Sequence, residues 1–348
     1  MKIISVVGAR PNFMKVAPLD RVFRNSGQVE SIIVHTGQHY DERMSKIFFE
    51  QLALPEPKYY LGINNRSSVQ LVAEIMLKFE EIVQQEQPDL ILVVGDVNST
   101  LACALVANKM QIRLVHVEAG LRSSDRGMPE ENNRILTDHI SNLLFVTEES
   151  GLQNLAREGV SPTRVKMVGN VMIDSLAFYQ KKLSELPVLY PPKSYALMTM
   201  HRPANVDNEA GLKKITTIIE TIGQHTPIVL PLHPRTAHRL QKYGLLQKLE
   251  QLTTLHILPP QGYLEFLQLM KNATLVITDS GGIQEETTYL QIPCITLRDS
   301  TERPITVTLG TNHLVPNLDV QKTEQIVLDI LAGKTKSASI PPLWDGKA

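Results

Sequence analysis

The sequence has few of the features that mark secreted, membrane-embedded or nucleic-acid-binding proteins. Only two of its 348 residues are cysteines, Cys103 and Cys294, and both lie in apolar segments, which indicates buried, reduced thiols. No apolar run approaches the roughly 20 residues of a membrane helix, and the opening MKIISVVGARPNF lacks the features of a secretion signal. The formal net charge is −1, so no overall field attracts nucleic acid or an anionic membrane. We therefore expect a cytoplasmic protein that binds neither.

Two further classes of site are excluded by missing motifs. None of the 19 glycines stands two residues from another, so the G-x-G-x-x-G dinucleotide fingerprint is absent. There is no H-E-x-x-H and no cysteine pair, and His233 and His238 do not have the spacing of metal ligands. Gly333-Lys334-Thr335 resembles the end of a Walker loop, but Leu328 occupies the position of the earlier glycine. We expect no cofactor and no metal ion.

Short β-branched runs alternate with amphipathic stretches of helical length, and one of these stretches, Ser68–Glu86, has a single apolar face. The runs are nearly continuous in apolar residues, as in parallel strands that are covered on both faces. The expected strands are Lys2–Val7, Ser31–His35, Asp89–Val94, Arg113–Val117, Leu143–Val146, Arg164–Val168, Tyr195–Met200, Pro227–Leu232, Thr254–Leu258, Thr274–Thr278 and Pro293–Leu297. This pattern predicts an α/β fold with two doubly wound, Rossmann-like domains that face a cleft.

The domain boundary is marked by a polar, proline-rich stretch at Lys181–Ser194 (KKLSELPVLYPPKS). A chain of 348 residues is too long for one ordinary core, which also favours two domains. We place the first domain at residues 1–176 and the second at residues 177–348.

Ligands of open α/β sheets bind beyond the carboxyl ends of the strands, and here most strands run into polar clusters. At Ser280-Gly281-Gly282 an apolar strand turns into a helix that opens with Gln-Glu-Glu. Glycines allow backbone N–H groups to approach an anion, and the helix N-terminus favours negative charge, so this turn can bind phosphate. The alternative is a helix simply capped by Ser280, with acids in its first turn.

The first strand leads into a helix start that carries two cations, Arg10 and Lys15. Cations are unfavourable at the positive end of a helix dipole, unless an anion lies between them. We interpret the pair as an anion-binding feature, and the alternative is a pair of solvated surface charges.

Carboxylates gather at the same edge of the first sheet. Asp96 and Glu118 follow neighbouring strands, and Glu130 and Glu131 begin a helix soon afterwards. Mutual repulsion and burial would raise the pKa of at least one of these acids toward neutrality and prepare it for proton transfer. For Glu130 and Glu131 the alternative is an ordinary pair of acids at a helix N-terminus.

Ten of these clusters, in order from residue 8 to residue 304, resemble motifs of the UDP-N-acetylglucosamine 2-epimerase family of the non-hydrolysing bacterial type. They are GARPNFMKVAP, TGQH, VVGDVNST, HVEAGLRS, PEENNR, GNVMID, HR at 201–202, HP at 233–234, TDSGGIQEE and RDSTERP. Singly most are weak, but ten in order are specific.

The resemblance implies a GT-B-like fold with UDP held mainly by the second domain. Its implied substrate-binding residues are Arg10, Lys15, Gln261, Phe266, Ser280, Gly281, Gly282, Glu286 and Arg303, with Glu286 on the ribose. Its implied catalytic residues are Asp96, Glu118, Glu130 and His201. It further implies a homodimer, a UDP-sugar as the substrate and a role in polysaccharide biosynthesis.

The chemistry supports the same activity independently. The hydrogen on C2 of the sugar is not acidic, so inversion there requires transient oxidation or elimination. Oxidation would need a nicotinamide, whose fingerprint is absent. Elimination needs a carboxylate base at C2 and stabilisation of departing UDP. We hypothesise a 2-acetamidoglucal intermediate, with His201, Arg202 and Arg10 offsetting the charge on the leaving phosphate.

Some positions depart from the family pattern. Ala204 replaces a glutamate that often follows the His-Arg pair. Tyr40, Asp41 and Met44 replace residues linked to an allosteric substrate site, which argues against allosteric activation. Relatives continue into a last helix where this sequence ends in PPLWDGKA, so we expect that helix to be trimmed or absent.

Several functions stay open at this stage. TGQHYD and HPRT also occur in relatives acting on UDP-2,3-diacetamido-glucuronate. A hydrolysing epimerase, a glycosyltransferase and a non-catalytic nucleotide-sugar sensor are further alternatives.

Overall fold

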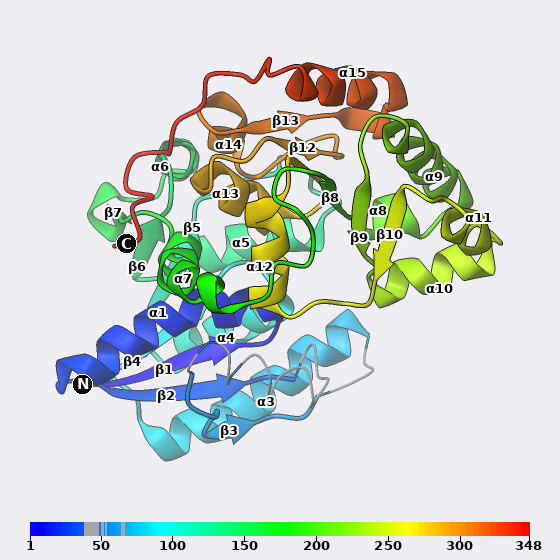
Figure 1. The fold of residues 1–348 in the computed structure, drawn as a ribbon. Coiled ribbons are helices and arrows are strands. Elements are labelled where there is room, and N and C mark those ends of the chain that lie inside the picture. The colour runs from blue at the N-terminus through cyan, green and yellow to red at the C-terminus, as the bar shows by residue number, and fades with distance from the viewer. Residues whose placement is uncertain (38–48, 50–51, 53, 64–66) are drawn as a thin grey trace. The chain divides into compact units, whose positions relative to one another are not determined.

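The computed structural model describes residues 1–37, 49, 52, 54–63 and 67–348 (Figure 1). The chain forms two compact units: unit 1 comprises Met1–Phe178 and Pro342–Ala348, and unit 2 comprises Tyr179–Pro341. Each unit has its own parallel sheet flanked by helices. The expected α/β class with two doubly wound sheets is therefore confirmed. Within the described ranges, no helix is long and apolar enough to span a membrane.

Unit 1 contains a seven-stranded sheet whose spatial order is β3-β2-β1-β4-β5-β6-β7. Its strands, all paired in parallel, are β1 (Lys2–Val7), β2 (Glu30–His35), β3 (Tyr59–Tyr60), β4 (Leu90–Val94), β5 (Arg113–Ala119), β6 (Leu143–Val146) and β7 (Val165–Met167). The winding direction reverses between β1 and β4. Ligand sites of open α/β sheets lie at such a reversal, so the loops after β1 and β4 occupy the expected place for one.

The helices of unit 1 cover both faces of its sheet. They are α1 (Arg10–Ser26), α3 (Ser68–Glu86), α4 (Asn98–Lys109), α5 (Pro129–Ile140), α6 (Glu149–Arg157) and α7 (Val171–Gln180), whose last two residues belong to unit 2. The predicted helix at Ser68–Glu86 is confirmed. Its N-cap residue is Ser67, whose hydroxyl accepts a hydrogen bond from the Gln70 amide. Its side chains Ile75 and Phe79 are fully buried in the sheet core.

Helix α1 contains an internal proline and still continues. Pro18 has no N–H to donate to the Met14 carbonyl one turn earlier. The Ser175 hydroxyl of α7 donates to that carbonyl instead. The replacement bond satisfies a buried acceptor and ties α1 to α7, which fixes the helix that carries Lys15.

Unit 2 repeats the plan with six parallel strands in the order β10-β9-β8-β11-β12-β13. The strands are β8 (Ala196–Thr199), β9 (Ile228–Pro231), β10 (Leu255–Leu258), β11 (Leu275–Thr278), β12 (Cys294–Thr296) and β13 (Asn312–Leu314). The helices are α8 (Pro203–Val206), α9 (Glu209–Gly223), α10 (Pro234–Lys242), α11 (Leu246–Glu250), α12 (Tyr263–Asn272), α13 (Gly281–Tyr289), α14 (Pro304–Thr308) and α15 (Val320–Leu331). The order reverses between β8 and β11.

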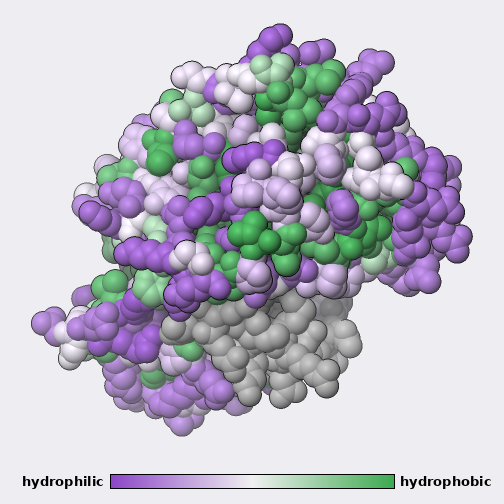
Figure 2. Space-filling model, in the orientation of Figure 1, coloured by the Kyte–Doolittle hydropathy of each residue, from purple (hydrophilic) through white to green (hydrophobic). Residues whose placement is uncertain are grey.

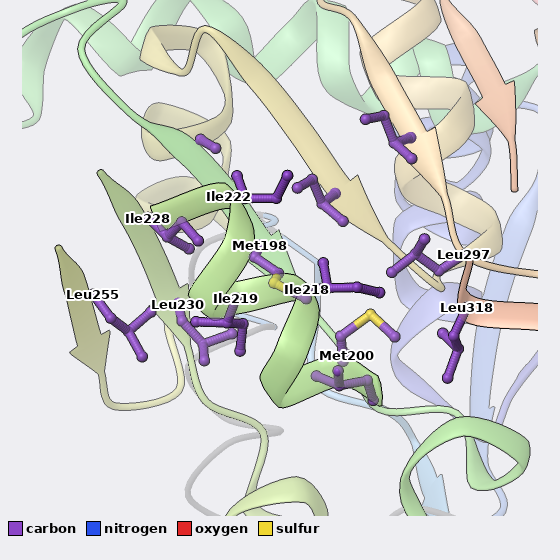
Figure 3. Close-up of a cluster of buried hydrophobic side chains, with 14 of the residues drawn as sticks. Met198, Met200, Ile218, Ile219, Ile222, Ile228, Leu230, Leu255, Leu297 and Leu318 are labelled. Atoms are coloured by element: carbon purple, nitrogen blue, oxygen red, sulfur yellow. The ribbon is translucent and has the colours of Figure 1, made fainter. Parts of the chain in front are cut away.

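The larger core of unit 2 lies between its sheet and α9. Met198 and Met200 meet Ile218 and Ile222 of α9 there, as Figure 3 shows, and all four are at most 2% exposed. Hydrophilic residues cover the outer side of α10 and α11 in Figure 2. Helix α10 accordingly buries Leu240 while its basic residues face outward.

Each predicted strand coincides with an observed one to within two residues at either end. Two strands were not predicted, Tyr59–Tyr60 and Asn312–Leu314, and both are too short for their sequence pattern to differ from that of a loop. Cys103 and Cys294 are both buried and free, as expected, and burial raises the pKa of the Cys294 thiol to about 11.

The C-terminal segment Pro342–Ala348 packs on unit 1, whereas the sequence-based boundaries put it in the second domain. Trp344 is 1% exposed, and its indole Nε1 donates a hydrogen bond of 3.0 Å to the Thr147 carbonyl. Gly169, at φ +99°, allows the chain at Leu343 to pack closely against it, because a Cβ there would lie 2.2 Å from the Leu343 carbonyl oxygen. The segment is therefore part of the unit 1 core.

Replacing Trp344 with alanine should lower the stability of unit 1 by about 3–5 kcal/mol, because a buried ring is lost and a cavity remains. The matched control is Ile340→Ala, since Ile340 is 44% exposed and its loss should cost no more than about 0.5 kcal/mol. Thermal unfolding followed by circular dichroism measures both variants. Equal melting temperatures for the two would contradict the packing of this segment.

Candidate active site

Asp96 follows β4 at the winding reversal of unit 1. The preceding Gly95 has φ +68°, which turns the chain sharply at the strand end. The side-chain amide of Asn133 on α5 donates to the Asp96 carbonyl at 2.9 Å, and the Arg134 guanidinium pairs with the Asp96 carboxylate. Helix α5 therefore holds Asp96 through its backbone and its side chain, and the carboxylate stays partly open to solvent, at 26% exposure.

Glu118 lies at the end of the neighbouring strand β5 and is 1% exposed. Its backbone has φ +69°, and the register with β6 shifts between Val117 and Ala119, which marks a bulge. The left-handed region is unfavourable for a residue with a Cβ and, outside glycine, is concentrated at functional sites. The strained turn points the carboxylate of Glu118 toward the same strand edge as Asp96.

Two buried cations lie among these acids. The Lys15 ammonium is 2.5 Å from Glu118 Oε2, and the Arg134 guanidinium, which pairs with Asp96, is 3.9 Å from Glu118 Oε1. Lys15 and Arg134 are 5% and 1% exposed. A buried charge is tolerated only when an opposite charge compensates it. The four side chains Lys15, Asp96, Glu118 and Arg134, here called the acid–base cluster, form one compensated group.

The sequence predicted that Asp96 and Glu118 follow neighbouring strands, and β4 and β5 are neighbours. It also predicted repulsion between the acids, which Lys15 and Arg134 offset. Lys15 was expected to bind the substrate, and its partner within unit 1 is Glu118. Arg134 was not singled out. The signal was present, because the PEENNR segment places an arginine one helical turn after Glu130.

The two acids at the start of α5 have different environments. Glu131 is 3% exposed and accepts hydrogen bonds from the Ser123 amide at 2.7 Å, the Ser123 hydroxyl at 3.0 Å and the Ser124 amide at 3.0 Å. Glu130 is exposed. Glu131 is thus fixed on the preceding loop, and Glu130 is the member of the pair that is available to a ligand.

In unit 2, His201 follows β8 at the second winding reversal and is held by Asp279, which follows β11. The carboxylate of Asp279 accepts hydrogen bonds from the backbone amides of His201 and Arg202, at 3.1 and 2.9 Å, and from the side chain of Asn205 at 3.1 Å. His201 Nδ1 lies 3.1 Å from Asp279 Oδ1. Burial would raise the pKa of Asp279, but His201 and the other donors hold it below its usual value.

The helix α13 that follows Asp279 begins at Gly281, and the predicted strand–turn–helix is confirmed. Ser280 is the N-cap residue, but its side chain makes no capping hydrogen bond. A Cβ on Gly281 would lie 2.8 Å from Arg303 Nη1, so the glycine lets this cation approach the helix start. Gly282 is the second residue of the same turn. The arrangement combines a helix N-terminus with a guanidinium, which favours an anion.

Three arginines and two carboxylates lie together beside this turn. Arg298 forms a two-bond pair with Glu302 at 2.8 and 3.0 Å, and Arg303 pairs with Glu302 at 3.3 Å and with Glu285 at 2.8 Å. Arg202 Nη2 is 3.7 Å from Glu302 Oε1. Burial opposes the ionisation of Glu302, yet the neighbouring arginines lower its pKa far below the usual range. Asp279 also acts on Arg202, so three arginines and three carboxylates meet here and their charges compensate one another.

Glu286 is one helical turn further along α13 and is 5% exposed. Burial raises its pKa to about 8, against the opposing effect of the Tyr263 hydroxyl. Phe266 of α12 packs against the second apolar cluster of unit 2, together with Ile283 of α13. Gln261 precedes α12 and donates to the Pro259 carbonyl at 2.7 Å. The residues predicted to bind uridine thus all lie in the α12–α13 region of unit 2.

Some sequence-based predictions lie outside what the structure describes. Tyr40, Asp41 and Met44, on which the allosteric argument depended, fall in the undescribed range, and for Arg10 only its place at the start of α1 is described. Ala204 lies in α8. Among the described side chains, no group of three or more His, Cys, Asp or Glu residues is placed to hold a metal ion.

A family model described as UDP-N-acetylglucosamine 2-epimerase matches residues 21–348 of this chain. The chain belongs to the UDP-N-acetylglucosamine 2-epimerase family. The resemblance seen in the motifs is confirmed, and with it the expectation of an isomerase.

Individual relatives of this epimerase-family chain agree with that assignment. A UDP-N-acetylglucosamine 2-epimerase of Methanocaldococcus jannaschii is 45% identical over 325 residues, which are 90% of this chain and 88% of that protein. The crystal structure of the M. jannaschii UDP-GlcNAc 2-epimerase in complex with UDP-GlcNAc and UDP matches with a TM-score of 0.91 and 42% identity, over 99% of this chain and 97% of that one. A UDP-2,3-diacetamido-2,3-dideoxy-D-glucuronate 2-epimerase of Pseudomonas aeruginosa is 41% identical over 321 residues, 90% of this chain and 88% of that protein.

The contrast between Glu130 and Glu131 in this epimerase-family chain gives a matched pair of variants. Glu131→Gln puts amide hydrogens against buried donors and should cost about 1–3 kcal/mol of stability. Glu130→Gln, at an exposed position, should change stability by less than about 0.5 kcal/mol. Denaturant titration of the two variants measures the difference. A Glu131→Gln variant as stable as Glu130→Gln would show that the loop contacts of Glu131 are absent in solution.

Proposed function

We propose that this protein interconverts UDP-N-acetylglucosamine and UDP-N-acetylmannosamine by eliminating UDP and adding it back. The observation that carries the proposal is the acid–base cluster, in which two carboxylates end neighbouring strands of unit 1 and are held by Lys15 and Arg134. The names of the relatives, which are 2-epimerases of UDP-sugars at 41–45% identity, support it.

The reaction begins with removal of the C2 proton of the sugar by a carboxylate. The electron pair of the C2–H bond becomes the C1=C2 double bond, and the bond from C1 to the UDP oxygen breaks with its electrons leaving on UDP. The product of this step is 2-acetamidoglucal. An acid then returns a proton to the opposite face of C2, and UDP adds back to C1. Asp96, Glu118 and Glu130 are the acids we assign to these proton transfers, and they need no cofactor.

The departing UDP carries negative charge, which unit 2 is equipped to stabilise. The start of α13 offers the backbone N–H groups of Gly281 and Gly282, next to the side chain of Ser280, and Arg303 lies beside it. His201 and Arg202, both fixed by Asp279, are the further groups we assign to the leaving phosphate. Glu286 is assigned to the ribose hydroxyls, Gln261 and Phe266 to the uracil, and Arg10 and Lys15 to substrate contacts from unit 1.

A second substrate is favoured by one specific observation. The 41% identity to the P. aeruginosa enzyme makes UDP-2,3-diacetamido-2,3-dideoxy-glucuronate the alternative sugar for the same reaction. That sugar carries a carboxylate, which UDP-N-acetylglucosamine lacks. Comparing kcat/KM for the two substrates decides between them.

We also propose that the enzyme is a homodimer and that it serves polysaccharide biosynthesis. Light scattering of the purified enzyme tests the oligomeric state.

The proposed proton transfer predicts the behaviour of three conservative variants. Asp96→Asn, Glu118→Gln and Glu130→Gln should each lower kcat by at least about 100-fold, since a general acid or base contributes that much. Their affinity for UDP should stay close to that of the wild type, because UDP is assigned to unit 2. Initial rates and calorimetric titration with UDP measure the two quantities. Wild-type rates in all three variants would remove these acids from the mechanism.

Turnover in heavy water identifies the reaction itself. The wild type should incorporate solvent deuterium at C2 and keep the UDP linkage, as followed by proton NMR. Free N-acetylmannosamine with UDP would instead indicate a hydrolysing epimerase. Unlabelled sugar that turns over only with an acceptor would indicate a glycosyltransferase, and binding without turnover would indicate a sensor.

The raised pKa of Glu286, about 8, predicts a pH dependence of UDP affinity. If the ribose hydroxyls donate to the ionised carboxylate, binding requires loss of the proton, so affinity should rise with pH. The increase from pH 7 to pH 9 should be about tenfold, because the ionised fraction rises by that factor around a pKa of 8. Glu286→Gln should remove the increase, as measured by calorimetry. The same slope in that variant would exclude Glu286 as its source.

A further inference from the structure

His116 is a buried histidine behind the acid–base cluster that the proposed mechanism does not use. It lies on β5 and is fully buried. Its Nδ1 is 2.7 Å from Asp138 Oδ1, and its Nε2 is 2.7 Å from the carbonyl oxygen of Gly95. Both ring nitrogens therefore have a close partner.

Those partners determine where the protons are. The Gly95 carbonyl has no hydrogen to donate, so Nε2 must carry one. Asp138 also accepts from the Gly120 amide at 3.1 Å and pairs with Arg122 Nη2 at 2.8 Å, so its carboxylate is surrounded by donors. Burial would raise the pKa of Asp138, but His116 and Arg122 lower it below the usual value. An ionised Asp138 can only accept, so Nδ1 must carry a hydrogen as well.

We propose that His116 is held as an imidazolium between Asp138 and the Gly95 carbonyl, and that this pair is a positioning device for Asp96 and Glu118. The second part rests on the proposed function, because it assigns the pair a purpose in proton transfer. His116 is thus a positioning residue and does not exchange protons with the substrate.

The contacts of the pair reach the backbone on either side of both acids. Gly95, which His116 holds, directly precedes Asp96. Gly120 follows Glu118 by two residues, and its amide donates a hydrogen bond to Asp138. This bond stabilises the strained turn at Glu118. Asp138 also lies one helical turn after Arg134, whose guanidinium pairs with Asp96. One ion pair therefore fixes two strand ends and the helix that covers them.

The charges around His116 balance without solvent. Asp138 faces His116 and Arg122, and Arg122 also pairs with Glu158 at 2.7 Å. A neutral His116 would leave one ring nitrogen without a hydrogen, facing an acceptor at 2.7 Å, which is repulsive. While Asp138 is ionised, the contacts of the pair therefore require a hydrogen on both ring nitrogens.

Nitrogen-15 NMR of the histidine side chains tests the protonation state without turnover. Subtracting the spectrum of His116→Gln identifies the His116 signals among the ten histidines. We expect both ring nitrogens at the shift of protonated imidazole nitrogen in the native protein. One nitrogen at the far-downfield shift of an unprotonated ring would overturn the proposal.

The positioning role is tested with Asp138→Asn, which keeps the shape and removes the charge. Since small displacements of reacting groups cost about 100-fold in rate, kcat should fall by about that factor, and KM should stay within about threefold. Asp138→Glu, which restores the carboxylate, should recover part of kcat. The matched control is Leu136→Ala on the same helix, because Leu136 is 52% exposed, and its kinetics should equal those of the wild type. A lower melting temperature with unchanged kcat in Asp138→Asn would leave only a structural role and overturn the proposal.

A crystal structure of Asp138→Asn separates this inference from the proposed function. The carboxylates of Asp96 and Glu118 should be displaced from their wild-type positions. Unchanged positions would overturn the positioning role, whatever the enzyme does. A wild-type protein that fails to exchange deuterium at C2, but shows the imidazolium and the displacement, would instead defeat the proposed reaction and keep the structural device.

Discussion

Compensation of buried charge is the constraint on which both candidate site regions depend. Glu118 is almost fully buried with an ionisable side chain, and it can remain so because the Lys15 ammonium is 2.5 Å away. The same rule explains Asp279, whose carboxylate collects backbone and side-chain donors from the loop after β8. In each unit a buried acid at the carboxyl edge of the sheet thereby fixes its neighbours, Lys15 in unit 1 and His201 with Arg202 in unit 2. Losing a compensating partner would therefore disturb the site as well as the fold.

The two units meet this constraint in different ways. In unit 1 each acid has a cation, so the local charge is close to balanced. In unit 2 one carboxylate is shared between several cations, because Glu302 lies close to Arg202, Arg298 and Arg303.

Much of this organisation is visible in the sequence, for identifiable reasons. The strands could be predicted because continuous β-branched runs between helical patterns have few alternatives, and the acids because Asp96 and Glu118 directly follow such runs. The partners were harder to find. These partners come from α1, β5 and α5, which are far apart in the sequence: Lys15, His116, Arg134 and Asp138. Their pairing depends on how strands and helices pack in three dimensions. Side-chain pairs that form across the sheet have no local signature: the sequence named Lys15 and Glu118 without pairing them, and it did not single out Arg134, His116 or Asp138.

The left-handed backbone at Glu118 has a consequence for the evolution of this scaffold. Glycine or asparagine tolerates that conformation better than glutamate, but either one would leave the Lys15 ammonium buried without its carboxylate partner. A more stable variant of this strand end would therefore have to replace Lys15 together with Glu118. Fold stability and the position of this carboxylate therefore place opposite demands on the φ angle of Glu118.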